Sequence, residues 1–190
     1  MNPDKKKTVA VFCGSKDGND PVFVSHAYRL GLLLAENGIA IIYGGGGKGI
    51  MGALANGHLE AGGSITGIIP KMLVDFEHQH NGLTELVVTE DMHTRKKIMY
   101  ERCDLAIILP GGFGTLDELF EMLTWNQLSI HDKQILVLNS GGFYTHLMAH
   151  MQHLEDTGFL YDRVSERIRM FDTPLDLMHI LVGQDALRST

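Results

Sequence analysis

Cysteine, positive charge and long apolar runs are all scarce in this sequence. The two cysteines, Cys13 and Cys103, have no CxxC spacing and are too few for a disulfide framework, so we expect a protein of the reduced cytoplasm. The apolar run Val9–Cys13 near the N-terminus is too short for a signal peptide or a membrane span. The 16 basic and 23 acidic residues give a net charge of −7, which argues against DNA or RNA as a partner.

The length and composition fit one soluble globular domain. The chain has 190 residues, 44% of them hydrophobic, which is enough to bury a core without disulfide or metal crosslinks. No repeat, low-complexity segment or linker divides it. We therefore expect a loose N-terminal tail at residues 1–7 and a single domain at residues 8–190.

Short apolar runs alternate with longer amphipathic stretches along the chain. The runs predict strands at 8–13, 39–43, 64–69, 84–88, 105–109, 134–138 and 168–171. The amphipathic stretches predict helices at about 20–37, 49–61, 89–102, 116–130 and 142–158, and one from Pro174. Residues 71–82 have no clear period and are expected to leave the regular pattern.

This alternation predicts an α/β fold with right-handed crossovers and a parallel sheet that helices cover on both faces. The expected architecture is a Rossmann-like, doubly wound sheet of about seven strands in the order 3-2-1-4-5-6-7. Ligands bind such sheets beyond the carboxyl ends of the strands, where the strand order reverses. In the expected order this point lies between the first and fourth strands.

Glycine clusters follow three of the predicted strands on that carboxyl edge. They are Cys13–Ser15, Gly44–Gly52 and Gly111–Thr115. Without Cβ atoms, such loops let backbone N–H groups approach an anion, and the next helix adds further N–H groups and a partial positive charge. One cluster alone is equally consistent with a tight turn, but three on one edge favour a phosphate-binding site.

Neither long cluster matches a standard nucleotide fingerprint. Lys48 is followed by Gly49 and not by Ser or Thr, so a P-loop is disfavoured. The GxGxxG match at Gly44, Gly46 and Gly49 follows the second predicted strand, and no acidic residue ends a strand about 20 residues later. A dinucleotide-dependent dehydrogenase is therefore poorly supported.

The third cluster continues into an acidic helix. Thr115 and Glu118 form a capping-box pattern, with Thr115 as the expected N-cap. The pattern alone needs no chemistry, yet Glu118 and Glu121 can share a helix face beside the proposed phosphate loop. A carboxylate beside a ribose could stabilise an oxocarbenium-like carbon or activate water.

Basic residues begin the helix that follows the fourth predicted strand. Cations at a helix N-terminus are mildly unfavourable, so an anionic ligand or opposing acids are expected to compensate Arg95, Lys96 and Lys97. A solvated basic face is the alternative.

The remaining candidates are weaker. His146, His150 and His153 share a helix face, but nothing else at ligand spacing supports a metal, so we expect surface histidines and no metal site. His78 and His80 fall in the irregular segment and could border the site. Cys13 is expected to be a small buried residue.

Three motifs together resemble one protein family. YGGGGKGIMG at Tyr43–Gly52, MHTRK at Met92–Lys96 and PGGFGTLDE at Pro110–Glu118 are similar to those of the LOG family, the cytokinin riboside 5′-monophosphate phosphoribohydrolases, whose members are often labelled lysine decarboxylases. The resemblance extends over nearly the whole chain. It implies a homodimer with the site near the interface, and no cofactor.

The resemblance also implies a reaction and a set of site residues. The reaction is hydrolysis of the N-glycosidic bond of an adenosine 5′-monophosphate-type nucleotide, either a cytokinin riboside monophosphate or AMP, to free base and ribose 5-phosphate. Arg95 and Glu118 match the catalytic pair of the family. The expected substrate-binding residues are Gly14, Ser15, Gly45, Gly46, Met92, Lys96, Gly111, Gly112, Gly114, Thr115 and Glu121. A nucleotide-binding or sensing module without catalysis is the alternative.

Overall fold

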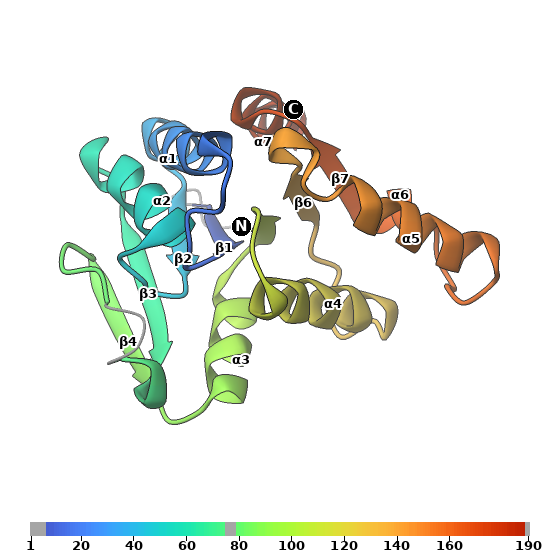
Figure 1. The fold of residues 1–190 in the computed structure, drawn as a ribbon, viewed down its shortest axis with the longest axis horizontal. Coiled ribbons are helices and arrows are strands. Elements are labelled where there is room, and N and C mark those ends of the chain that lie inside the picture. The colour runs from blue at the N-terminus through green and yellow to red at the C-terminus, as the bar shows by residue number, and fades with distance from the viewer. Residues whose placement is uncertain (1–6, 75–78, 189–190) are drawn as a thin grey trace.

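The computed structural model describes residues 7–74 and 79–188 of the chain (Figure 1). The strands are β1 (Thr8–Phe12), β2 (Ala40–Tyr43), β3 (Ile65–Pro70), β4 (Glu85–Thr89), β5 (Leu105–Ile108), β6 (Ile135–Leu138) and β7 (Ile168–Phe171). The α-helices are α1 (Pro21–Glu36), α2 (Gly49–Glu60), α3 (Met92–Arg102), α4 (Phe113–Gln127), α5 (Thr145–Asp156), α6 (Val164–Arg167) and α7 (Pro174–Arg188). Two short 3₁₀ turns, η1 (Lys71–Leu73) and η2 (Ser140–Gly142), complete the set.

All strand pairs are parallel, and the seven strands described form one sheet in the order β4-β3-β2-β1-β5-β6-β7. The Rossmann-like doubly wound fold is confirmed, but the expected strand order is wrong in one place. The fourth strand lies at the sheet edge beside β3, and β5 is the strand that pairs with β1. The reversal of strand order therefore lies between β1 and β5.

The physical reason for this difference is the polarity of the fourth strand. Val88 is 53% exposed, and Glu85 forms a surface ion pair with Arg102 (3.5 Å), as suits an edge strand. In β5 every residue is buried, because the run LAII carries no polar side chain. A strand buried on both faces belongs in the middle of a parallel sheet.

Helices cover both faces of the sheet. One core cluster joins α1, α2 and α7 to residues such as Val9, Val11 and Ile107 of the strands. The other joins α3, α4 and α5 to the alternate strand residues, such as Ala10 and Phe12. Side chains that alternate between the two clusters follow the two-residue period of a strand, and Figure 1 shows α1 and α2 on the opposite side of the sheet from α3 and α4.

Capping side chains mark the starts of α1 and α3. Asp20 is the N-cap of α1, and its carboxylate accepts a hydrogen bond from the Val22 amide. Asp91 is the N-cap of α3, and its carboxylate accepts one from the Thr94 amide. Gly38, with a φ of +68°, follows the end of α1. These caps fix where α1 and α3 start relative to the strands before them.

Candidate active site

The glycine clusters after β1 and β5 meet where the strand order reverses. The Gly14 amide donates a hydrogen bond to the Pro110 carbonyl (3.0 Å), and the Met51 amide donates one to the Gly14 carbonyl (3.2 Å). A cavity of about 390 Å³ opens at this point. It is lined by Gly14, Ser15, Lys16, Gly18, Phe23, Ile50, Pro110, Gly111, Gly112 and Phe143. Its volume is within the range of small-molecule sites, and four of the expected substrate-binding residues lie in its wall.

The Thr115 side chain packs against Gly111 of the third glycine cluster and does not cap α4. The N-cap of α4 is Gly112, and no side chain caps it, so the expected capping box is wrong. A methyl group built on Gly111 would collide with the Thr115 hydroxyl, which shows how closely the buried Thr115 packs beneath the loop. Glycine at position 111 therefore lets the loop lie against the first turn of α4, and the exposed Gly112 and Gly114 carry the first amides of the helix.

Arg95 lies against the second glycine cluster. It projects from the first turn of α3, and a methyl group built on Gly44 would lie 2.5 Å from its Nη2 atom and 3.3 Å from Sδ of Met51. The bare backbone at Gly44 thus makes room for the guanidinium group. Nη1 of Arg95 also lies 3.7 Å from Sδ of Met92, the first residue of α3.

Arg95 and Glu118 form a buried ion pair. Nη2 of Arg95 lies 3.6 Å from Oε1 of Glu118, and the two residues are 4% and 6% exposed. Nε of Arg95 has no hydrogen-bond partner within the described residues. Burying two charges carries a large desolvation cost, so a pair with an unused donor at the edge of a glycine loop is typical of a ligand site.

Contacts link the residues around the strand reversal. They run from Glu118 through Arg95, Gly44, Met51 and Gly14 to Gly111 and Thr115, and helix α4 carries both Thr115 and Glu118. These contacts join all three glycine clusters to the catalytic pair expected from the family motifs. The family resemblance implied Arg95 and Glu118 as a catalytic pair, and the structure brings the two side chains into contact.

Lys96 and Glu121 contact other protein side chains. Nζ of Lys96 lies 3.1 Å from Oδ2 of Asp117 and 3.0 Å from Oε2 of Glu121. Partial burial lowers the pKa of Lys96, but its hydrogen bonds to Glu121 and Asp117 outweigh burial, and its pKa is raised above the ordinary value. The opposing acids expected to compensate the cations of this helix are therefore present, on α4.

Sequence reasoning missed Tyr100 as a part of this network. Its hydroxyl donates a hydrogen bond to Oε2 of Glu121 (2.8 Å) and lies 3.3 Å from the Glu118 carbonyl oxygen. The available signal was its spacing, because Tyr100 follows Lys96 by four residues and shares its helix face. Burial is the main cause that raises the pKa of Tyr100 well above its usual range, and the hydrogen bond to Glu121 is the next largest cause.

The second glycine cluster also contacts the irregular segment. Gly45, at a φ of +84°, accepts a hydrogen bond from the His80 amide (2.9 Å), and the Gly46 carbonyl accepts one from the Tyr43 hydroxyl (3.1 Å). His80 is held through Nε2 by Oδ1 of Asn56 (3.0 Å), so it borders the glycine loop as expected. The expectation for His78 falls outside the described residues.

The sequence comparisons identify the family. A family model described as "Possible lysine decarboxylase" matches residues 51–181. The cytokinin riboside 5′-monophosphate phosphoribohydrolase of Rhodococcoides fascians is 40% identical over 163 residues, 85% of this chain and 82% of that protein. The corresponding LOG5 protein of Arabidopsis thaliana is 41% identical over 154 residues, 81% of this chain and 68% of that protein. The chain belongs to the LOG family of phosphoribohydrolases.

Solved structures with the same fold include proteins that have other names. The molybdenum cofactor carrier protein of Chlamydomonas reinhardtii superposes with a TM-score of 0.74 at 18% identity, covering 96% of this chain and 99% of that one. The molybdenum cofactor binding protein of Rippkaea orientalis has a TM-score of 0.71 at 22% identity, covering 95% and 98%. At such identities the likeness shows the fold alone.

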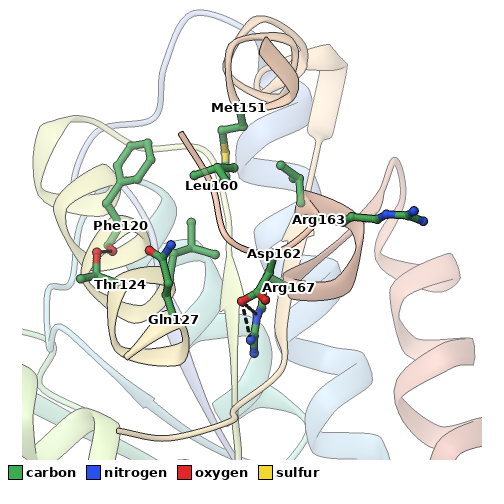
Figure 2. Close-up of a pocket in the computed structure, with 10 residues that line it drawn as sticks. Phe120, Thr124, Gln127, Met151, Leu160, Asp162, Arg163 and Arg167 are labelled. Atoms are coloured by element: carbon green, nitrogen blue, oxygen red, sulfur yellow. Dashed lines mark hydrogen bonds and ion pairs between the residues drawn. The ribbon is translucent and has the colours of Figure 1, made fainter. Parts of the chain in front are cut away.

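A second hollow of the LOG-family chain lies away from the ion pair. It measures about 120 Å³ and lies between the later turns of α4 and the segment from α5 to α6. Figure 2 shows Phe120, Met151 and Leu160 at its apolar side and the ion pair of Asp162 with Arg167 (2.6 Å) on the other. It is much smaller than the cavity at the strand reversal and shares no residue with the expected site.

The histidine stripe of α5 is exposed, as expected for surface residues. Among the described residues no group of three or more His, Cys, Asp or Glu side chains is arranged to hold a metal ion. In the same part of the chain, no helix combines the length and the apolar character that a membrane crossing requires.

Proposed function

We propose that this protein is a catalytic domain over residues 8–190 that hydrolyses the N-glycosidic bond of adenosine 5′-monophosphate-type nucleotides. The products are the free base and ribose 5-phosphate, and the substrates include cytokinin riboside 5′-monophosphates and AMP. The observation that carries the proposal is the buried pair of Arg95 with Glu118 beside the glycine loop at the start of α4. The names of the relatives at about 40% identity support the same reaction.

The 5′-phosphate is held by main-chain amides in this proposal. Gly112 and Gly114 are exposed at the N-terminus of α4, where free N–H groups and the helix dipole favour an anion. Gly14 and Ser15 line the same cavity as Gly111 and Gly112. Such a site binds phosphate even though the protein as a whole is negatively charged.

Glu118 acts at the anomeric carbon. As the bond to the base breaks, positive charge develops on the sugar, and a carboxylate at that point stabilises it or positions the attacking water. The N-glycosidic bond breaks with its electron pair on the base, the water oxygen bonds to the anomeric carbon, and the proton that the water loses balances the proton that the departing base takes up. Arg95 orients Glu118 and contacts the ribose, because an arginine that stays protonated is a poor proton donor.

A binding module without catalysis is the weaker alternative. Such a module needs the glycine loops but gains nothing from a buried ion pair, whose desolvation cost lowers stability relative to apolar side chains. The carriers of similar fold show only that the architecture is compatible with binding proteins. The Arg95–Glu118 pair therefore favours the enzyme.

Lysine decarboxylation, the activity in the description of the family model, has little physical support. Pyridoxal phosphate chemistry requires a lysine that can become a neutral amine and form a Schiff base. Lys96, the lysine nearest the ion pair in sequence, has a raised pKa and is held by two carboxylates. Its charge is stabilised, which opposes that chemistry.

The test is direct detection of the products. The purified protein is incubated separately with AMP, with N6-isopentenyladenosine 5′-monophosphate and with the corresponding nucleosides, and free base is measured by chromatography. Release from the monophosphates but not from the nucleosides supports the proposal, because the phosphate anchors the substrate. Tight nucleotide binding without release of base would favour the binding module.

The proposal includes a homodimer with the site near its interface, as the family resemblance implies. In support, Phe113 at the first position of α4 is 93% exposed beside the glycine loop, and exposed aromatic residues are enriched at interfaces. Light scattering on the purified protein tests the state, and a monomer that hydrolyses AMP at full rate would contradict this part of the proposal.

A further inference from the structure

Tyr100 connects the apolar core to the active-site helices. Its ring is buried beneath the sheet and makes edge contacts with Phe12 and Trp125, at centroid distances of 5.9 Å and 4.7 Å. Its hydroxyl leaves this apolar environment toward α4. A buried tyrosine hydroxyl requires a hydrogen-bond partner, and the partner here is Oε2 of Glu121 at 2.8 Å.

The hydrogen bond from Tyr100 is part of a chain between α3 and α4. Glu121 accepts from Tyr100 and also pairs with Nζ of Lys96 at 3.0 Å. Lys96 in turn contacts Asp117 at 3.1 Å. Because Lys96 follows Arg95 directly and Asp117 precedes Glu118, this chain fixes the register in which Arg95 and Glu118 face each other.

The same chain sets the charge around Glu118. Three carboxylates, Asp117, Glu118 and Glu121, lie within two turns of α4, against the two cations Arg95 and Lys96. Like charges nearby favour the protonated form of a carboxyl group, and hydrogen-bond donors to those neighbours reduce this effect. The Tyr144 hydroxyl donates a hydrogen bond to the Leu109 carbonyl oxygen (2.7 Å), and its pKa is raised chiefly by burial and in smaller part by the charges of Cys13 and Glu118.

We propose that Tyr100, acting through Glu121 and Lys96, is a positioning residue that holds the Arg95–Glu118 pair in register and sets the arrangement of charges around the Glu118 carboxylate. In this view Lys96 and Glu121, which the family resemblance implied to be substrate-binding, act on the catalytic pair and not on the nucleotide. The inference rests on the proposed function for its kinetic readout, but its effect on the ionisation of Glu118 can be measured without turnover.

The first test is Tyr100→Phe, which keeps the ring in the core and removes only the hydroxyl. We expect kcat to fall about tenfold with KM within about twofold, because the catalytic pair is misplaced while the phosphate loop is untouched. The acid limb of the kcat profile should move to higher pH, because Glu121 has lost a donor and its charge acts more strongly on Glu118. The matched control is Tyr28→Phe, which removes a hydroxyl bonded to Glu60 (2.5 Å) between α1 and α2 and should change neither quantity.

A second variant and a second readout separate positioning from general structural damage. Glu121→Gln removes a neighbouring negative charge, so the ionisation midpoint of Glu118 should move to lower pH, opposite to its shift in Tyr100→Phe. The midpoint is followed by carboxyl ¹³C NMR, with the resonance assigned from Glu118→Gln, and needs no activity. Wild-type protein that releases no base would refute the proposed function alone. Midpoints that do not move, or that move in the same direction in both variants, would overturn the positioning role.

Discussion

Replacing Glu118 by glutamine tests the proposed reaction most directly, because it removes a charge and leaves the side-chain shape almost unchanged. Glu118 is 6% exposed and its carboxylate lies 3.6 Å from Nη2 of Arg95. An amide at this position cannot stabilise positive charge at the anomeric carbon as a carboxylate does. Loss of such a group lowers kcat by about 10²–10⁴-fold, while nucleotide affinity should be retained, because the phosphate is held by the loop amides.

The effect of Glu118→Gln on stability should be smaller than its effect on the activation free energy. The glutamine oxygen can still accept a hydrogen bond from Arg95, so the buried guanidinium keeps one partner. A loss of about 2 kcal/mol is expected for weakening a charged hydrogen bond, which lowers Tm by about 4–8 °C in a protein of this size. The variant therefore stays folded under assay conditions, and a loss of rate can be assigned to chemistry.

The assay measures release of adenine from AMP at saturating substrate, with thermal unfolding and AMP binding measured on the same samples. The control is Glu101→Gln, which removes a carboxylate from an exposed pair with Lys97 (3.8 Å) on α3 and should leave kcat within about twofold of the wild type. A Glu118→Gln variant that turns over AMP within about threefold of the wild type would refute the role assigned to Glu118, because that loss is far smaller than the one expected for an acid–base group.

Three further variants or conditions test the local packing. Gly44→Ala would place a methyl group 2.5 Å from Nη2 of Arg95, so base release should fall at least about tenfold while circular dichroism stays unchanged. Gly31→Ala would drive a methyl group into the backbone of α2 at Leu54, and thermal unfolding should show a loss of about 1–3 kcal/mol. Burial lowers the pKa of His58 below 6.5, against the opposing effect of its backbone hydrogen bonds. As pH falls, the unfolded chain therefore takes up the proton before the folded protein does, and the free energy of unfolding should decrease below about pH 6.5. The decrease should be less steep in His58→Gln. A wild-type free energy of unfolding that does not change with pH in this range would contradict the prediction.

Periodicity predicted the strands and helices well, because the sheet is buried on both faces. The strand Ile168–Phe171 and the start of the last helix at Pro174 agree with the structure. The order of the strands in the sheet was harder to predict from the sequence, because it depends on which strand has a neighbouring strand on both sides. The exposed Val88 and the surface pair of Glu85 place β4 at the edge, and a run of two or three apolar residues does not distinguish edge from centre.

The site was predictable where motifs place residues directly after strands, and less so where side chains meet across helices. Arg95 and Glu118 each come shortly after the carboxyl end of a strand, and they meet at that edge although β4 and β5 are not neighbours in the sheet. Thr115 has the sequence pattern of a helix cap, yet its hydroxyl packs against Gly111, because a glycine one residue before the helix can adopt the extended N-cap conformation by itself. Tyr100 gives the signal of a core aromatic residue, and only the three-dimensional contacts show where its hydroxyl points.

The buried ion pair and the residues around it have one common explanation. A buried pair lowers stability relative to apolar side chains of similar volume, and here Gly44 has no side chain where the guanidinium lies. One hypothesis explains three features together, namely that the pair acts on a ligand. The features are the costly ion pair, the glycine that makes room for it, and the chain of acids and Lys96 that fixes its register. Without a ligand, each of these features would need a separate reason.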